Sequence, residues 1–279
     1  MVVTSKIDTE GSLLGQLIVQ TLRARGLPVE ARLQLGPTRI VRQALLSGAV
    51  DVCPEYTGSG ASFFRLPNDP AWHDPAAGYA LVRRLDREQN SLIWLTPAPA
   101  DNGWGIATRK DMAQRFGLAS MIDFGRLVAS GSYIYLAASV EFVESRGALP
   151  AFERAYGFRL RQDQLLMLAG GDTSSTLRAA SEGLSGVNAA MAYGTDGALS
   201  ALGMVMLDDP RQAQIIFQPA PVVRASVLAA HPDIEPWLAS VFSLLTGSVL
   251  SGLNAQIAVD GSDPVAVARG FLQRSKLPA

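Results

Sequence analysis

The chain has 279 residues, 48% of them hydrophobic, which is enough for about two domains with packed cores. Its 24 basic and 25 acidic residues nearly cancel, and it contains no basic run or basic–aromatic stripe. These features disfavour a nucleic acid or an anionic membrane surface as the partner and favour a small, weakly charged ligand or another protein.

The N-terminal part alternates strand and helix patterns. Strands are expected over 2–5, 29–35 and 49–53, and helices over 12–25 and 38–47. Ile40 is expected on the buried side of the second helix. The strand at 29–35 is expected to be half-buried, because apolar and polar residues alternate along it. A β-α-β-α-β order predicts parallel strands joined by right-handed crossovers.

A helix over 78–90 and a strand over 91–95 follow, and then residues 97–104 are rich in Pro, Gly and Asn. We interpret this segment as an interdomain crossover. Beyond it, helices are expected over 121–129, 150–156 and 173–182, and strands over 133–137 and 189–193, which predicts a second α/β lobe. Further strands are expected over 204–207 and 215–223, and two closing helices over 234–245 and 264–274. We predict that residues 1–102 and 206–279 form lobe 1 and that residues 103–205 form lobe 2.

A candidate binding site lies where the third strand ends. This strand is expected to end at Pro54 and to lead Tyr56, Thr57 and Ser59 into a Gly-rich turn. Ligands of parallel α/β sheets bind outside the carboxyl ends of the strands. We therefore expect an exposed aromatic ring and two hydroxyl groups to face a ligand there.

Two further aromatic residues have similar positions: Trp104 lies at the crossover and Tyr193 ends the strand at 189–193. Each such ring can contribute about 0.5–2 kcal/mol to binding a desolvated cation. Micromolar affinity needs about 8 kcal/mol, so polar groups must contribute as well. The alternative for each ring is a packing role inside or between the lobes.

Lys6 follows the first strand and is one of three lysines among the basic residues. A lysine there offers a compact point charge to an anion, and an ordinary surface lysine is the alternative.

Catalytic and metal-binding patterns are missing from the sequence. Gly58–Ser62 does not match a nucleophile elbow, and Ala169–Ser174 lacks the Lys and the spacing of a phosphate-binding loop. His73 and His231 are the only histidines, and neither has a second ligand at metal-binding spacing. We expect no enzymatic activity, no metal and no cofactor. Cys53, the single cysteine, is expected to fill the core.

Several segments together resemble the substrate-binding proteins of osmoprotectant ABC importers, the glycine betaine/carnitine/choline family. Residues 170–173 and 185–196 look most like its YehZ/OsmF branch. The other matching segments, in the family's order along the chain, are Thr4–Glu10, Ala44–Gly58, Pro97–Asn102, Glu141–Arg146, Ala192–Gly197 and Pro219–Val223.

This resemblance implies a type II periplasmic binding protein fold, in which two α/β lobes are joined by two crossover strands and the ligand lies in the cleft between them. It implies alternation between open and ligand-closed states and delivery of the solute to an ABC permease in the membrane. It also implies a periplasmic location, with a signal peptide absent from this chain. We expect the protein to act as a monomer.

The resemblance also assigns roles to individual positions. Tyr56, Trp104 and Tyr193 match an aromatic cage that holds a quaternary ammonium by cation–π contacts. The remaining matched positions supply polar groups to the ligand, above all to its carboxylate. These positions are Lys6, Thr57, Ser59, Asn102, Arg146 and Thr195. For Arg146 the alternative is a surface salt bridge.

Two departures from the family pattern leave the identity and affinity of the ligand open. Trp104 stands where relatives commonly have Tyr, and residues 170–177 lack the fourth cage aromatic. The alternative function is a ligand-sensing module of a receptor or regulator with the same fold. The missing catalytic triad disfavours a hydrolase.

Overall fold

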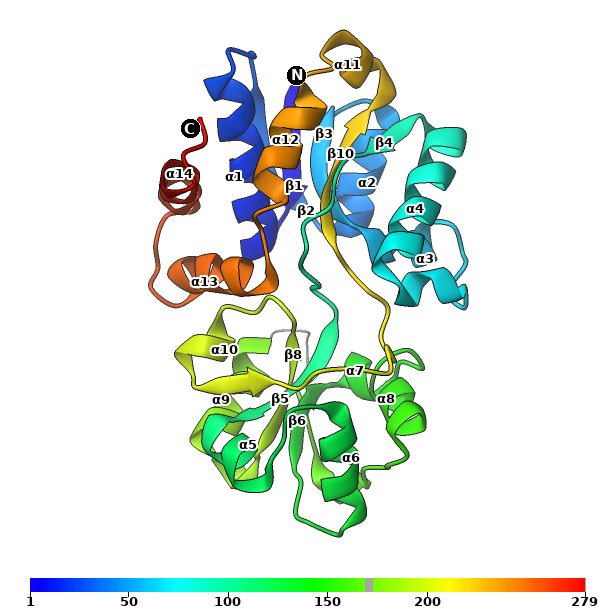
Figure 1. Cartoon of the computed structure of the whole chain (residues 1–279), viewed down its shortest axis with the longest axis vertical. Helices are drawn as coiled ribbons and strands as arrows, with labels where there is room; N and C mark the ends of the chain where they lie inside the picture. The colour runs from blue at the N-terminus through cyan, green and yellow to red at the C-terminus, as the bar shows by residue number, and fades with distance from the viewer. Residues whose placement is uncertain (169–172, 279) are drawn as a thin grey trace. The chain divides into compact units, whose positions relative to one another are not determined.

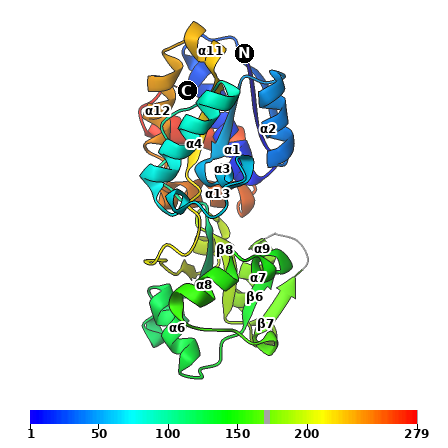
Figure 2. The same cartoon turned by 90° about the vertical axis from the view of Figure 1, so that its right-hand side faces the viewer.

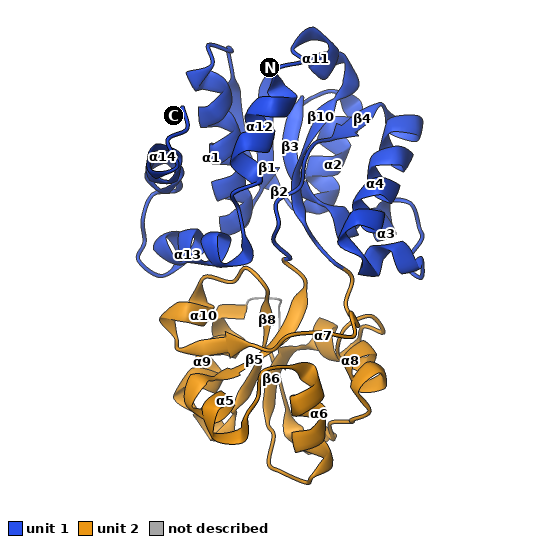
Figure 3. Cartoon of the chain, viewed as in Figure 1, with its two compact units in different colours: residues 1–101, 216–279 blue, residues 102–215 orange. Residues whose placement is uncertain are grey.

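The computed structural model describes residues 1–168 and 173–278, and the chain divides into two compact units (Figure 1). Unit 1 consists of Met1–Asp101 and Ile216–Ala279, and unit 2 consists of Asn102–Ile215 (Figure 3). The chain returns to unit 1 at Ile216 rather than at residue 206. The reason is that β9 (Met204–Met206) pairs with β5 (Trp104–Arg109) in the sheet of unit 2.

Unit 1 contains a five-stranded mixed sheet. Its strands, in spatial order, are β2 (Glu30–Gly36), β1 (Val2–Lys6), β3 (Val52–Tyr56), β10 (Pro219–Arg224) and β4 (Leu92–Trp94). β1 pairs in parallel with β2 and with β3, as the β-α-β-α-β pattern predicted. β10 runs antiparallel to both of its neighbours.

The helices of unit 1 are α1 (Thr9–Ala24), α2 (Thr38–Ser47), α3 (Gly60–Phe63), α4 (Pro75–Asn90), α11 (Ala225–Ala230), α12 (Ile234–Phe242), α13 (Gly247–Ala258) and α14 (Pro264–Arg274). In Figure 1, α1 and α14 lie on one side of this unit and α4 lies on the other, and Figure 2 faces the α4 side. The main core is built on α1, whose Leu13, Leu17 and Ile18 pack with Leu238 and Phe242 of α12.

Gly11 allows α1 to begin directly against the end of β1. A Cβ at this position would lie 2.8 Å from the carbonyl oxygen of Lys6, which is closer than real Cβ contacts come. Asp8 caps the helix by accepting a hydrogen bond from the Gly11 amide at 2.7 Å. As a result, the first turn of α1 places Glu10 beside the carboxyl end of β1.

Unit 2 repeats the strand arrangement of unit 1. Its sheet has the order β7 (Leu165–Leu168), β6 (Leu136–Ser139), β8 (Ala189–Tyr193), β5 and β9. β6 pairs in parallel with β7 and β8, whereas β5 is antiparallel to both β8 and β9. In each unit the reversed strand, β10 or β5, follows shortly after the chain enters that unit.

The helices of unit 2 are α5 (Lys110–Phe116), α6 (Met121–Ala129), α7 (Val140–Glu144), α8 (Leu149–Tyr156), α9 (Thr173–Glu182) and α10 (Ala198–Ala201). Phe124, Phe142 and Phe152 are fully buried in its main core. Across the described residues of both units, no single helix is long and apolar enough to cross a membrane. The pair α12 and α13 would meet that criterion only together, with an 85° bend between them.

Three details of unit 1 differ from the expectations. β3 extends through Tyr56 instead of ending at Pro54, because it pairs with β10 up to the register Pro219↔Tyr56. β2 is mostly exposed rather than half-buried, since it forms the edge of the sheet. Ile40, expected on the buried side of α2, is 38% exposed.

Candidate functional site

In unit 1 the candidate residues gather at the carboxyl edge of the sheet. β1 and β3 are parallel neighbours, so Lys6 and Tyr56 at their ends lie at the same edge. The first turn of α1 brings Glu10 to this edge, and α13 contributes Asn254. We refer to the residues joined there as the Lys6 cluster, which consists of Lys6, Glu10, Glu55, Tyr56, Ser59 and Asn254.

Lys6 is a buried, ion-paired residue. Its Nζ lies 2.6 Å from Glu55 Oε1, and the two side chains are 10% and 4% exposed. The same Nζ lies 4.4 Å from the centroid of the Tyr56 ring, within the range of a cation–π contact. Lys6 is therefore not an ordinary surface lysine, and its charge already has a carboxylate partner.

Tyr56 is held from both ends of its side chain. Its backbone N–H donates to Glu55 Oε1 at 2.8 Å, and its hydroxyl donates to Glu10 Oε1 at 2.6 Å. The residue is only 7% exposed and belongs to the main core of unit 1. The exposed ring expected from the strand end is thus buried, because β3 continues through this residue and α1 covers it.

The two hydroxyl residues after Tyr56 have different partners. Ser59 Oγ donates to Glu55 Oε1 at 3.0 Å, so it belongs to the Lys6 cluster. Thr57 is 2% exposed; its Oγ1 donates to the carbonyl of Ile216 at 3.2 Å and accepts from the amide of Gln218 at 3.1 Å. Thr57 therefore fastens the segment that re-enters unit 1.

In unit 2 the candidate aromatic residues form a cross-strand pair. Trp104 at the start of β5 lies directly opposite Tyr193 at the end of β8. Their rings are stacked, with centroids 6.5 Å apart and an interplanar angle of 25°. Phe142 of α7 meets the Trp104 ring edge-on at 5.9 Å. Since Phe142 is fully buried, it supports the pair from the core side.

The Trp104–Tyr193 pair retains features of an open binding surface. Both residues are partly exposed. The indole Nε1 of Trp104 is buried, and no described residue accepts its hydrogen bond. Buried donors normally have an acceptor, so an unpaired indole N–H in a candidate site is a position where a ligand oxygen or a water molecule could bind.

The other predicted residues of unit 2 lie in different environments. Arg146 is exposed just beyond α7, and its guanidinium forms no ion pair with any residue of the described ranges. The surface salt bridge considered as its alternative is thus not seen there. Asn102 is partly exposed, whereas Thr195 is buried, with 1% of its surface accessible.

Three members of the Lys6 cluster were not predicted from the sequence as site residues: Glu10, Glu55 and Asn254. Glu10 and Glu55 lie inside the matched segments and next to a predicted site residue or strand end, which was the available signal. Asn254 had no such signal, because its Nδ2 reaches Glu10 Oε2 at 2.7 Å from a helix that lies 244 residues further along the chain.

Cys53 was expected to fill the core rather than to take part in the site. Cys53 is buried, and burial, followed by the nearby Glu55 carboxylate, raises the pKa of its thiol, so the group is an unreactive part of the core. The glycine-rich loop considered for phosphate binding lies in part outside the described residues, at 169–172.

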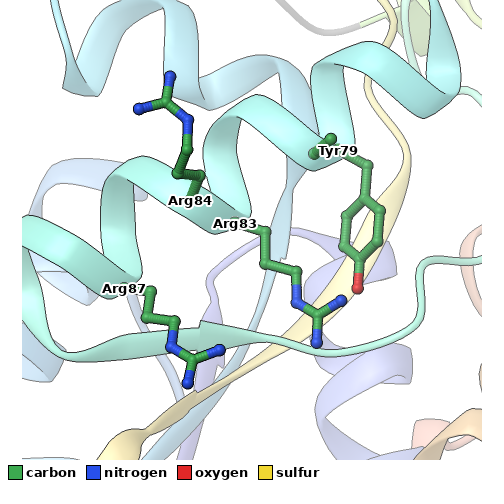
Figure 4. A pocket seen from close by; sticks show the side chains of 5 residues that line it. Tyr79, Arg83, Arg84 and Arg87 are labelled. Atoms are coloured by element: carbon green, nitrogen blue, oxygen red, sulfur yellow. The ribbon is translucent and has the colours of Figure 1, made fainter.

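A separate pocket lies along α4 (Figure 4). It is lined by Tyr79, Arg83, Arg84 and Arg87 together with Ala80. Arg84 lies 3.4 Å from Glu88, and Arg83 lies 3.9 Å from Glu235, so two of the three arginines take part in exposed ion pairs. None of the residues predicted to bind ligand lines this pocket.

Comparison with known proteins identifies the family. The OpuAC profile, described as the substrate-binding domain of ABC-type glycine betaine transport systems, matches residues 1–274. The chain belongs to this family. Family members are periplasmic or extracytoplasmic binding proteins rather than enzymes, so the expectation of no catalysis and the resemblance found in the sequence are both confirmed.

Individual proteins also match over nearly the whole chain. The glycine betaine-binding protein YehZ of Escherichia coli (strain K12) is 54% identical over 272 residues, covering 98% of this chain and 89% of YehZ. A glycine-betaine-binding protein of Pseudomonas aeruginosa is 28% identical, with coverage of 98% and 86%.

Solved structures agree with this assignment. Apo YehZ superposes with a TM-score of 0.91 over 98% of both chains. A glycine betaine/carnitine/choline ABC transporter structure gives a TM-score of 0.87 at 17% identity, covering 99% of this chain and 98% of that one, and this match supports the fold alone. The predicted type II periplasmic binding protein fold is confirmed. The comparisons give no support to a sensor of a receptor or regulator.

Proposed function

We propose that this protein binds a quaternary-ammonium or related zwitterionic solute, such as glycine betaine or choline, and delivers it to an ABC permease. The observation that carries the proposal is the stacked, partly exposed Trp104–Tyr193 pair in a member of the OpuAC family. Aromatic faces attract a desolvated cation and need no charged partner to do so. The names of YehZ and of the Pseudomonas relative point to the same solute class.

The proposed ligand contacts are assigned within each unit separately. In unit 2, Trp104 and Tyr193 contact the ammonium group. The unpaired guanidinium of Arg146 contacts a carboxylate, because its planar fork can form two parallel hydrogen bonds. Unit 1 contributes Lys6, Tyr56 and Ser59 through the Lys6 cluster. Asn102 supplies a further polar group, whereas Thr57 and Thr195 are buried and help to position their segments.

We also propose a periplasmic, monomeric protein. The location outside the cytoplasm is supported by the family, whose members work there and supply a permease with solute. Light scattering of the purified protein with and without solute would test the monomer, and a stable dimer in both conditions would contradict it.

Calorimetric titration with glycine betaine, choline, carnitine and proline betaine tests the proposed ligand class. We expect saturable heat from at least one of these solutes, and a much weaker response to an amino acid without a quaternary nitrogen. If none of the four produces heat at millimolar concentration, recognition of quaternary ammonium is wrong, although the fold and the family remain.

A further inference from the structure

Glu55 links three of the residues proposed to bind the solute. A single oxygen, Oε1, accepts hydrogen bonds from Lys6 Nζ at 2.6 Å, from the Tyr56 amide at 2.8 Å and from Ser59 Oγ at 3.0 Å. The carboxylate side chain is 4% exposed. Its other oxygen, Oε2, accepts no hydrogen bond from any residue that the structure describes. This oxygen of a nearly buried side chain therefore remains available as an acceptor in the cluster.

The ion pair changes what Lys6 can offer to a ligand. A lone buried ammonium would attract a solute carboxylate as a full positive charge. With Glu55 at 2.6 Å, the approaching carboxylate meets a pair whose charges cancel. In contrast, Arg146 of unit 2 is exposed and has no carboxylate partner among the described residues.

A second carboxylate adds negative charge to the same cluster. Glu10 Oε1 accepts from the Tyr56 hydroxyl at 2.6 Å, and Oε2 accepts from Asn254 Nδ2 at 2.7 Å. Both oxygens of Glu10 therefore act as hydrogen-bond acceptors in the cluster. A second carboxyl group close to Lys6 favours a cationic group of the solute over an anionic one.

We propose that Glu55 is a specificity-determining residue that sets the charge preference of the solute site. By neutralising Lys6 it lowers the affinity for solutes that carry a carboxylate, relative to solutes with a net positive charge. Its free oxygen can accept a hydrogen bond from a hydroxyl group of the solute. This inference rests on the proposed function, because it concerns the same site, and it predicts selectivity between two members of the proposed solute class.

The test is the ratio of the affinities for glycine betaine and choline in the wild type and in Glu55→Gln. Both solutes carry a trimethylammonium group, and they differ in a carboxylate against a hydroxyl. The amide introduced by this substitution keeps an acceptor for Lys6 and removes the negative charge, so we expect the betaine-to-choline ratio to rise at least about tenfold. The matched control is Glu88→Gln, which removes an exposed carboxylate of the same unit and should leave the ratio unchanged.

An unchanged or lowered ratio in folded Glu55→Gln would overturn the inference. If that variant does not fold, Lys6→Gln provides a second test, because it leaves Glu55 without its counter-charge. We then expect choline to bind at least about tenfold more tightly than it binds the wild type, and unaltered choline affinity would contradict the role of Glu55. If the wild type binds neither solute, the proposed function fails first.

Discussion

At the residue scale, two aromatic side chains that the sequence presents in the same way have different environments. Tyr56 is the last residue of β3 and Trp104 is the first residue of β5, so each lies at a terminus of a strand. Tyr56 is enclosed by Lys6, Glu10 and Glu55, whereas Trp104 is stacked on Tyr193 and stays partly exposed. Trp104 is therefore the more direct test of the aromatic contact.

Replacing Trp104 by alanine should weaken solute binding at least tenfold, which corresponds to about 1.4 kcal/mol. The physical reason is that the substitution removes the Trp104 ring face and its stacking contact with Tyr193. Calorimetry gives the affinity. Tryptophan fluorescence gives a second measurement. Trp72 and Trp94 are fully buried in unit 1, and Trp237 packs against the core of unit 1 beneath Arg25, so a solute-dependent change should disappear with Trp104.

Tyr133→Ala is the matched control for this substitution. Tyr133 also belongs to unit 2, is 64% exposed and contacts another tyrosine ring at 6.3 Å, but it is not among the proposed site residues. We expect the solute affinity of Tyr133→Ala to stay within about twofold of that of the wild type. An unchanged affinity in Trp104→Ala would remove Trp104 from the site.

The candidate site was predictable only in part, and the limit is physical. Lys6 and Tyr56 could be brought together from the sequence because parallel neighbouring strands end at the same edge. Their partners could not be assigned, because the bond between Asn254 and Glu10 depends on how α13 packs against α1. Strand-end position alone also could not separate a buried ring from an exposed one.

At the element scale, prediction was best where local chemistry marks the boundaries. α2 ends at Gly48 in the left-handed conformation, and α14 begins with Asp263 accepting a hydrogen bond from the Val265 amide at 3.1 Å, so both helices have their predicted bounds. α13 was not predicted, because Gly247 and Gly252 weaken its pattern. The cap supplied by Thr246 to the Val249 amide was the usable signal.

A buried ion pair fixes α4 to the rest of unit 1. Asp86 is fully buried and accepts hydrogen bonds from Arg42 at 2.7 and 2.5 Å, from Trp94 Nε1 at 2.6 Å and from Asn90 at 2.8 Å. Asp86→Ala leaves Arg42 without its partner, so we expect the free energy of unfolding to fall by about 3–5 kcal/mol. Denaturant unfolding measures this change.

The control for Asp86 is Glu88→Ala on the same helix. It removes an exposed ion pair with Arg84 at 3.4 Å, and we expect the free energy of unfolding to fall by less than about 1 kcal/mol. Equal costs for the two substitutions would show that the Asp86 contacts do not hold α4 in place.

At the scale of the whole molecule, the chain crosses twice between units that share one strand order. The first crossing was visible in the sequence, because residues 97–104 interrupt every regular pattern. The second was not, because 204–206 reads as a strand in either unit and only its pairing with β5 assigns it to unit 2. Non-local strand pairing therefore decided the boundary that local patterns left open.

The most direct test of the central claim asks whether the protein recognises the positive charge of a quaternary nitrogen. Calorimetric titration would compare choline with 3,3-dimethylbutan-1-ol, and glycine betaine with 3,3-dimethylbutanoate, in which carbon replaces the charged nitrogen. We predict that each ammonium compound that binds does so at least about tenfold more tightly than its carbon analogue. Equal affinities within each pair would contradict recognition by the aromatic rings.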